Sequence, residues 1–300
     1  MAYQLVVCFD RLTGIPAPSA RPAKGNTGVH PAPCPPVGAP ELHALETALG
    51  VRDDHAARVT VVALGPVSCC EPLREALYRG ADEAILVFDS RMTGSDPLAA
   101  GYILSRALRK IGPDVVVCPA RTAGGDAASI GVQAAGRAGI APITCVDRPV
   151  AIEGETVTAR RDTGAGWELV AARLPVLLTV TNAANTPRPP SMKRMMKYKR
   201  ARSREELESA IARGAPGARG SAGADVDRAC AALDAKGLLI KTWNLDDIGA
   251  DPSKCGTAGS PTRIERIQSL ALAEGGPRVF ENTDEGIARL VAALLKDHTI

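Results

Sequence analysis

The chain of 300 residues is poor in aromatic side chains, which make up only 3% of it. Valine, leucine, isoleucine and alanine must fill the core, because hydrophobic residues still reach 45%. The formal net charge is only +3, too small to indicate nucleic-acid binding by itself. Stacking on single-stranded nucleic acid needs exposed aromatic residues, and the most basic segment, residues 188–204, contains only Tyr198. We therefore expect a protein partner rather than a nucleic acid.

Long apolar runs are also missing, and so are the spacings that define metal and catalytic sites. No run approaches membrane-spanning length and no secretion signal is visible, so we expect a cytoplasmic protein. None of the eight cysteines forms CxxC and the four histidines are scattered, which favours free thiols over a metal site. The pair Asp246-Asp247 is more typical of a solvated acidic turn than of metal ligands. Neither GxSxG nor HExxH occurs, so we expect no catalytic side chains and assign any chemistry to a cofactor.

Apolar runs alternate with helical patterns through the first half of the chain. We expect buried strands at residues 3–9, 59–64, 84–88, 114–118 and 142–146. We expect helices at residues 41–49, 70–79, 96–111 and 126–138. This alternation predicts an α/β fold with a doubly wound, mostly parallel sheet, covered by helices on both faces.

The second half has a different texture. Residues 151–160 and 167–172 alternate around a Gly-rich turn, which predicts an antiparallel hairpin, and a further strand follows at 174–181. Short helices are expected at 205–213, 226–236 and 284–295, a short strand at 238–241, and a Gly-rich linker at 214–224. We predict one domain over residues 1–200, with a Pro-rich irregular loop at 13–40. Residues 201–300 are then a C-terminal arm that packs on a partner.

Ligands of an open parallel sheet bind at the carboxyl ends of its strands, near the point where the strand order reverses. Four segments have this position: residues 8–12, 65–66, 89–96 and 119–126. The last one, PARTAGGD, leads into a helix, where backbone N–H groups can hold a phosphate. Such Gly-rich turns also serve many ordinary strand-to-helix joints. Neither GxGxxG nor a Walker lysine occurs, so no standard nucleotide fingerprint applies.

Residues 174–200 read LPVLLTVTNAANTPRPPSMKRMMKYKR. An apolar strand pattern passes into prolines that hold the chain extended, and then into a basic segment with three methionines. This composition favours a contact arm.

This segment resembles the β (small) subunit of electron-transfer flavoproteins, whose members have an LPAV...T...PR...L..IMKAKKK pattern. Further matches are an ALE helix at Ala44-Leu45-Glu46, VTVVALGP at 59–66, LREALYRGA at 73–81 and GIAPIT at 139–144. Thr242-Trp243, Asp246-Asp247 and GSPT at 259–262 resemble the longer tail of the electron-bifurcating branch. The resemblance runs over about residues 40–300.

The resemblance implies a sheet of the adenine-nucleotide α-hydrolase-like type and a heterodimer with an electron-transfer flavoprotein α (large) subunit. That subunit binds an electron-carrying FAD. Ordinary small subunits hold AMP, whereas bifurcating ones hold a second FAD that meets NADH. The pair exchanges electrons with a flavin-dependent dehydrogenase of the acyl-CoA dehydrogenase type. Two alternatives are a non-redox adenine-nucleotide-binding regulatory protein and a degenerate scaffold without its own nucleotide.

The fold and the resemblance together nominate residues for the cofactor. They are Cys8, Phe9, Asp10, Gly65, Asp96, Cys118, Gly124, Gly125, Asp126, Ala127, Ser129 and Ile130. By position in the family's recognition loop, the residues nominated for the redox partner are Arg188, Met192, Lys193, Met195 and Lys197. Met192 stands where the family has a leucine that inserts into the dehydrogenase.

The chain departs from the family mainly at the nucleotide site. The family's Lys-Val-Pro after the first strand is Asp10-Arg11-Leu12, and its DGDT loop is Gly124-Gly125-Asp126-Ala127. Its two threonines after Asp96 are Pro97 and Ala100. Each lost hydroxyl removes one phosphate donor, while backbone donors remain.

Overall fold

A computed structural model describes residues 2–11, 34, 36–121, 129–212, 222–262 and 278–296. Most of the Pro-rich loop at 13–40 and the loop residues Gly124, Gly125, Asp126 and Ala127 lie outside this part of the chain. By its contacts the chain divides into two units, Met1–Arg263 and Ile264–Ile300.

The described residues contain the following strands, in chain order. They are β1 (Tyr3–Asp10), β2 (Ala57–Leu64), β3 (Glu83–Val87), β4 (Val115–Pro119), β5 (Ala141–Glu153), β6 (Thr156–Asp162), β7 (Trp167–Arg173), β8 (Val176–Val180) and β9 (Lys241–Trp243). The helices between and after them are α1 (Ala39–Asp54), α2 (Cys70–Arg79), α3 (Pro97–Ile111), α4 (Ser129–Ala138), α5 (Met192–Tyr198), α6 (Arg204–Ala212), α7 (Ala222–Asp234) and α8 (Asp284–Lys296). Three short 3-10 helices are η1 (Val67–Cys69), η2 (Ser90–Met92) and η3 (Pro252–Lys254).

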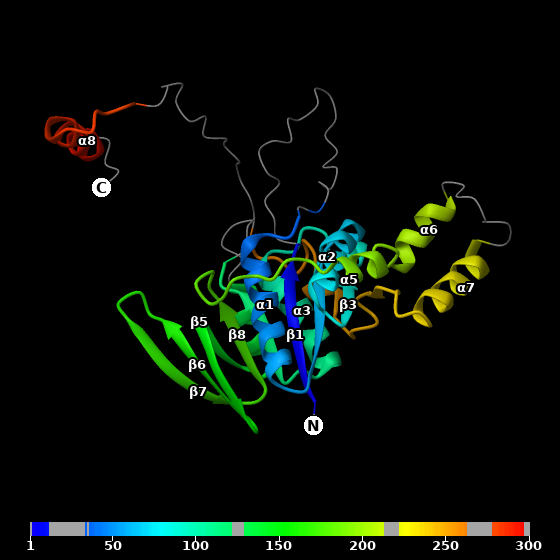
Figure 1. The fold of residues 1–300 in the computed structure, drawn as a ribbon. Coiled ribbons are helices and arrows are strands. Elements are labelled where there is room, and N and C mark those ends of the chain that lie inside the picture. Colours follow the sequence, from blue (N-terminus) through cyan, green and yellow to red (C-terminus); the bar gives the residue numbers. More distant parts are fainter. Residues whose placement is uncertain are drawn as a thin grey trace. The chain divides into compact units, whose positions relative to one another are not determined.

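These strands form one sheet in the order β7-β6-β5-β8-β4-β1-β2-β3-β9. Figure 1 shows β5, β6 and β7 side by side at one end of this sheet. All neighbours from β5 and β8 across to β9 are parallel, and only β5-β6 and β6-β7 are antiparallel. The predicted doubly wound, mostly parallel sheet is therefore confirmed. The strand order reverses between β1 and β4, since β1 has β2 on one side and β4 on the other.

The core lies on both faces of the sheet, as the solid apolar runs predict. Leu5, Val7 and Phe9 of β1 point into one cluster with α1 and α2, whereas Val6 and Cys8 point into the other with α3 and α4. This alternation follows from the two-residue period of a strand. Phe9 is fully buried and is the largest side chain of the first cluster's strand residues.

The second half of the chain differs from the prediction in three places. Strand β5 runs unbroken from Ala141 to Glu153, so it joins the predicted fifth strand to the first hairpin arm. Residues 192–198 form the helix α5, which the sequence analysis did not predict. The last short strand is β9, at Lys241–Trp243 rather than 238–241, and Leu239 forms only an isolated bridge with Arg202.

The predicted domain boundary near residue 200 falls inside the first unit. Strand β9 pairs in parallel with β3, Ile85 opposite Lys241 and Val87 opposite Trp243, so the segment after residue 200 completes the sheet. The amphipathic helix α8 belongs to the second unit, with Asp284 and Glu285 in its first turn and Lys296 in its last. That residues 201–300 pack on a partner stays a prediction.

Candidate functional site

The carboxyl ends of β1 and β4 meet at the reversal of strand order, where an open sheet binds its ligand. Val7 pairs with Val117, so the next residues, Cys8 and Cys118, stand side by side. Their thiols share a hydrogen bond, which together with burial holds the pKa of Cys8 well above its usual range. The nominated residues Cys8 and Cys118 are thus brought together, and their role in cofactor binding stays a prediction.

Burial limits what several nominated residues can offer a ligand. Cys8, Phe9, Cys118 and Ile130 are at most 5% exposed, and their side chains belong to the two core clusters. They reach a ligand only through backbone atoms. Ser129 begins α4, and its hydroxyl accepts a hydrogen bond from Gln133 Nε2 at 3.3 Å.

Arg11, directly after β1, is the most unusual side chain of this edge. Its side chain is only 5% exposed, and its Nη2 lies 2.8 Å from Oε1 of Glu41, which is 1% exposed. Nη2 also donates to the Pro36 carbonyl at 3.4 Å. The Nε of Arg11 is buried and has no hydrogen-bond partner among the described residues. A buried donor without a partner is costly, so it indicates a group beyond the described residues that accepts this N–H.

Glu41 holds this arginine from the first turn of α1. Its Oε2 accepts the Gly38 N–H at 2.5 Å, one arm of a capping box at the helix start. Burial raises the pKa of Glu41 above its ordinary value, although the Arg11 guanidinium and the Gly38 N–H act against this shift. Glu41 therefore serves both the helix end and the buried ion pair.

Gly65 ends β2 where the backbone passes close to Arg11. A Cβ at Gly65 would lie 2.8 Å from Cys69 Sγ and 2.9 Å from Arg11 Cβ. Its φ of +157° is also one that side chains rarely adopt. Only glycine lets β2 turn into η1 beside the arginine, which explains the residue at this nominated position.

The other half of the edge, after β3 and β9, is held together by its own charges. Arg91 Nη2 lies 2.6 Å from Asp89 Oδ2 and 2.8 Å from Asp246 Oδ2. The Arg91 hydrogen bonds, joined by the Leu245 N–H, lower the pKa of Asp89 to about 2. Asp247 accepts the Asn244 N–H in a tight turn. The acidic pair Asp246-Asp247 is thus used in an ion pair and a turn, in line with the sequence interpretation.

Asp96 has two structural tasks in this half. Its Oδ1 caps α3 by accepting the Ala99 N–H at 2.9 Å, as the sequence predicts, and its Oδ2 accepts the Thr262 N–H at 3.2 Å. Its own N–H donates to Ser260 Oγ at 2.8 Å. Burial raises the pKa of Asp96, but the hydrogen bonds from Ala99 and Thr262 outweigh it and the net shift is downward. The GSPT segment is therefore tied to the start of α3.

Some participants of this edge were not nominated from the sequence. Arg11 and Glu41 form the buried pair, and Ser260 and Thr262 meet Asp96 across more than 160 residues. Arg11 had a signal, its place directly after the first strand. The only sequence signal for Ser260 and Thr262 was their place in the GSPT motif at 259–262. Nominated Asp10 ends β1, and Gly124, Gly125, Asp126 and Ala127 lie outside the described residues.

The helix α5 presents a mixed apolar and basic surface. Met192 is 72% and Met196 57% exposed, one helical turn apart, and Lys193 and Lys197 are exposed beside them. Met195, by contrast, packs against the core cluster. Of the nominated residues, Met192, Lys193 and Lys197 are accessible and Met195 points inward; Met196 takes the outward place.

This helix is firmly attached to the sheet domain. Arg194 Nε donates to the Leu77 carbonyl at 2.7 Å, its Nη2 donates to the Ala81 carbonyl, and the guanidinium lies over the Tyr198 ring. Nominated Arg188 is already paired, with Nε 2.8 Å from Glu46 Oε2 and Nη2 2.8 Å from Asp53 Oδ2. Arg188 therefore positions the segment before α5 rather than standing free for a partner.

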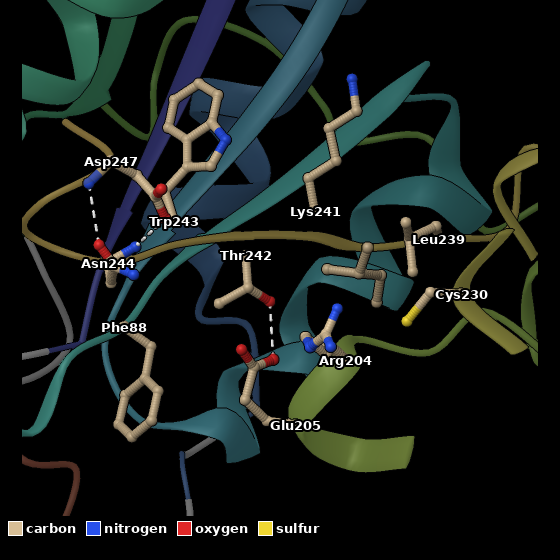
Figure 2. A pocket seen from close by; sticks show the side chains of 11 residues that line it. Phe88, Arg204, Glu205, Cys230, Leu239, Lys241, Thr242, Trp243, Asn244 and Asp247 are labelled. Carbon is tan, nitrogen blue, oxygen red and sulfur yellow. Dashed lines mark hydrogen bonds between the residues drawn. The ribbon is translucent and has the colours of Figure 1, made fainter. Parts of the chain in front are cut away.

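A hollow of about 340 Å³ opens beside β9 (Figure 2). Its lining residues come from β9 and its flanks, from α6 and α7, and from the end of β3; they are Phe88, Arg204, Glu205, Cys230, Leu239, Ile240, Lys241, Thr242, Trp243, Asn244 and Asp247. Thr242 Oγ1 donates to Glu205 Oε2 at 2.7 Å, so one acidic group in the wall is already used. None of the nominated residues lines this hollow.

Two other features, a metal centre and a membrane-spanning helix, are absent from the described part of the chain. No group of histidine, cysteine and acidic residues there is arranged to hold a metal ion. Across the same residues, no helix combines the length and apolarity that a bilayer crossing requires.

The fold and this edge define a class: a doubly wound α/β protein whose ligand edge lies at the reversal of strand order. The electron transfer flavoprotein domain matches residues 38–209, more than half of the chain. The chain belongs to the electron transfer flavoprotein family, as a β (small) subunit.

Similar curated proteins cover nearly the whole chain. The electron transfer flavoprotein subunit beta of Clostridium acetobutylicum is 28% identical over 99% of both chains. Protein FixA of Bradyrhizobium diazoefficiens is 33% identical over 85% of this chain and 78% of its own. The caffeyl-CoA reductase-Etf complex subunit CarD of Acetobacterium woodii is 29% identical over 87% of this chain and 86% of its own. The predicted family is therefore confirmed.

Proposed function

We propose that this chain pairs with an electron-transfer flavoprotein α subunit and binds an adenine nucleotide at the β1–β4 edge. The nucleotide is AMP in an ordinary carrier, or the adenosine end of a second FAD in a bifurcating one that uses NADH. A flavin would supply the one- and two-electron transfer that an electron carrier needs. The chain contributes binding, orientation and shielding from water.

The observation that carries this proposal is the buried Nε of Arg11. A guanidinium has a rigid fork of donors that matches a phosphate, and here Glu41 contacts the Nη2 end of that fork. A phosphate reaching Nε would satisfy the buried donor. The backbone ends of β1 and β4 then hold the rest of the nucleotide, since Cys8 and Cys118 offer backbone atoms only.

The partner surface is the exposed face of α5. Methionine side chains adapt to different apolar surfaces, which suits a transient contact. Lys193 and Lys197 beside them favour an acidic partner surface and speed the encounter electrostatically. We assign this face to a flavin-dependent dehydrogenase of the acyl-CoA dehydrogenase type.

The nucleotide content of the co-purified α–β complex tests the first part. After denaturation, chromatography counts the released FAD and AMP. One FAD with one AMP indicates the ordinary type, and two FAD indicate the bifurcating type. One FAD alone contradicts nucleotide binding here and indicates a scaffold subunit. A chain that stays a self-sufficient dimer and binds ATP without any α subunit indicates the regulatory alternative.

A variant can assign the nucleotide to Arg11. Replacing the pair together, Arg11→Met with Glu41→Leu, removes the guanidinium without leaving a buried unpaired charge. We expect this variant to lose the small subunit's nucleotide while the large subunit keeps its FAD. Arg58→Ala is the matched control, because Arg58 stands at the opposite end of β2 in an exposed pair with Glu83. Full nucleotide content in the double variant would contradict the assignment.

The α5 surface is tested by electron transfer from an acyl-CoA dehydrogenase. The double variant Met192→Ala with Met196→Ala should lower the second-order rate about tenfold, because interface anchors dominate binding. Trp167→Ala with Leu169→Ala is the control, since both residues are exposed on β7. Equal second-order rates for the two double variants would contradict the assignment of α5 as the contact surface.

A further inference from the structure

Two thiols meet next to the ligand edge. Cys69, in η1 between β2 and α2, is fully buried, and Cys34 precedes α1 and is half-buried. The Cys69 thiol donates to Cys34 Sγ at 2.9 Å. The Cys34 N–H donates to Ser68 Oγ at 3.1 Å, so the backbone of Cys34 is held against η1 as well. The contact joins residues that are 35 positions apart in the chain.

The surroundings make the two thiols unequal. The hydrogen bond from Cys69 lowers the pKa of Cys34, the Arg11 charge acts in the same direction, and burial and the Glu41 charge oppose them. The same hydrogen bond and burial raise the pKa of Cys69 far above its usual range. Since the thiolate is the nucleophile, the Cys34 sulfur attacks first, and Cys69 is the resolving thiol that reacts second.

We propose that Cys34 and Cys69 are a redox-active thiol pair that hydroperoxides oxidise to a disulfide. The Cys34 thiolate attacks the peroxide, the O–O bond breaks, and Cys34 becomes a sulfenic acid while the leaving oxygen takes up a proton as water or an alcohol. Cys69 then attacks the Cys34 sulfur; the S–O bond breaks and water leaves with the Cys69 proton. Two thiols lose two electrons and the peroxide gains them, and a dithiol reductant reverses the change.

Exposure distinguishes this pair from the other thiol contact of the chain. Cys8 and Cys118 also share a hydrogen bond, but they are only 3% and 5% exposed. No peroxide reaches them without local opening of the sheet. Cys8 and Cys118 therefore provide an internal control for oxidation that follows unfolding rather than the folded geometry.

The place of the pair gives the disulfide a consequence. Cys69 Sγ lies 2.8 Å from the Cβ position of Gly65, and the carbonyl of Pro36, two residues after Cys34, accepts from Arg11. A disulfide would fix the segment before α1 to η1 beside Arg11. The thiol chemistry itself does not depend on the proposed nucleotide, so each can fail without the other.

Peptide mapping of the full-length chain tests the proposal. Hydrogen peroxide is added, free thiols are blocked with N-ethylmaleimide, and tryptic peptides are examined by mass spectrometry. The peptide 25–52 contains Cys34 alone, and the peptide 59–74 contains Cys69 and Cys70. We expect these two peptides to become linked, with Cys34 lost at least about tenfold faster than Cys230, whose pKa is raised by burial. Dithiothreitol should restore both thiols.

Variants separate the two sulfurs. Cys69→Ser should abolish the link and leave a sulfenic acid on Cys34 that dimedone traps, whereas Cys34→Ser should leave Cys69 reduced. Cys70→Ser is the matched control and should keep the link, because Cys70 is buried beside Ser203 instead. The proposal is overturned if Cys34 oxidises no faster than Cys230 or Cys8, or if its link goes to Cys70 or to a second copy of the chain.

Discussion

The two halves of the sheet's carboxyl edge use charged side chains in opposite ways. After β1, one buried arginine meets one buried glutamate and keeps a donor that has no partner among the described residues. After β3, Asp89, Arg91 and Asp246 satisfy one another near the surface. The second half contains more charge and yet has little left to offer a ligand. A single unsatisfied buried atom is thus a stronger indication of a binding site than a cluster of paired charges.

The largest expected effect breaks the buried pair of the first half. Glu41→Ala leaves the Arg11 charge buried without its carboxylate and removes the Gly38 hydrogen bond. We expect the free energy of unfolding to fall by about 3–5 kcal/mol, measured by urea denaturation. Arg58→Ala, which breaks an exposed pair, should cost less than about 1 kcal/mol. Similar losses in the two variants would show that burial does not separate these ion pairs.

The next effect concerns Gly256, whose backbone packs against the Arg91 carbonyl in the second half of the edge. Gly256 has φ +60°, and a Cβ there would lie 2.3 Å from the Arg91 carbonyl oxygen. Gly256→Ala should therefore cost about 2–3 kcal/mol, from strain and a backbone clash together. Gly154 has φ +58° with open space around it, so Gly154→Ala should cost only about 1 kcal/mol by the same denaturation. Equal losses of unfolding free energy in the two variants would mean that the close packing of Gly256 against the Arg91 carbonyl does not affect stability.

A smaller effect concerns the joint between α3 and the GSPT segment. Asp96→Ala removes the helix cap and the acceptor of the Thr262 N–H, and should cost about 1 kcal/mol in urea denaturation. Asp96→Asn keeps an acceptor oxygen and should retain most of this stability. Limited proteolysis should cut near Thr262 faster in the alanine variant alone. An asparagine variant as weak as alanine would make the carboxylate charge, not the cap, responsible.

The smallest effect distinguishes the two halves by pH. The Arg91 hydrogen bonds lower the pKa of Asp89 to about 2, so its contribution to stability is present above the ordinary aspartate range and is lost as the pH falls through about 2. The stability difference between the wild type and Asp89→Asn should shrink between pH 7 and pH 2.5. Burial raises the pKa of Glu41, so the part of its contribution that depends on protonation is present at low pH and is lost as the pH rises through the raised value, while the ion pair with Arg11 remains. Parallel pH profiles for Asp89→Asn and Glu41→Gln would contradict this contrast.

Most of the fold was predictable, because strands β1 to β4 are solid apolar runs separated by helices with clear starts and stops. The helix α5 was missed because prolines precede it and it has only seven residues, although Met192, Met195 and Met196 have the i, i+3, i+4 spacing of a helix face. It is held by the Arg194 hydrogen bonds to Leu77 in α2 and to Ala81 just after it, which are tertiary contacts. Strand β9 was misplaced because an edge strand of three residues is defined by its partner β3.

The candidate site was predictable as a place but less so as a set of side chains. The edge segment after β1 was expected to matter, but burial decides that Phe9 and Cys8 face the core and that Arg11 Nε has no partner in the part of the chain that the structure describes. Met195 and Met196 are adjacent in the chain and are the same residue type, so the sequence alone does not distinguish them. Only the packing of α5 decides that Met196 faces outward and Met195 inward.

The sequence by itself determined the alternation of strands and helices and the family, and it nominated the general position of the candidate ligand edge. These properties follow from local periodicity and from short motifs, which need no partner elsewhere in the chain. Only the tertiary structure decided which charges are buried, which are paired, and that Cys34 meets Cys69. Burial and pairing depend on residues far apart in sequence, and their energies arise only when the packed sheet removes water from between them.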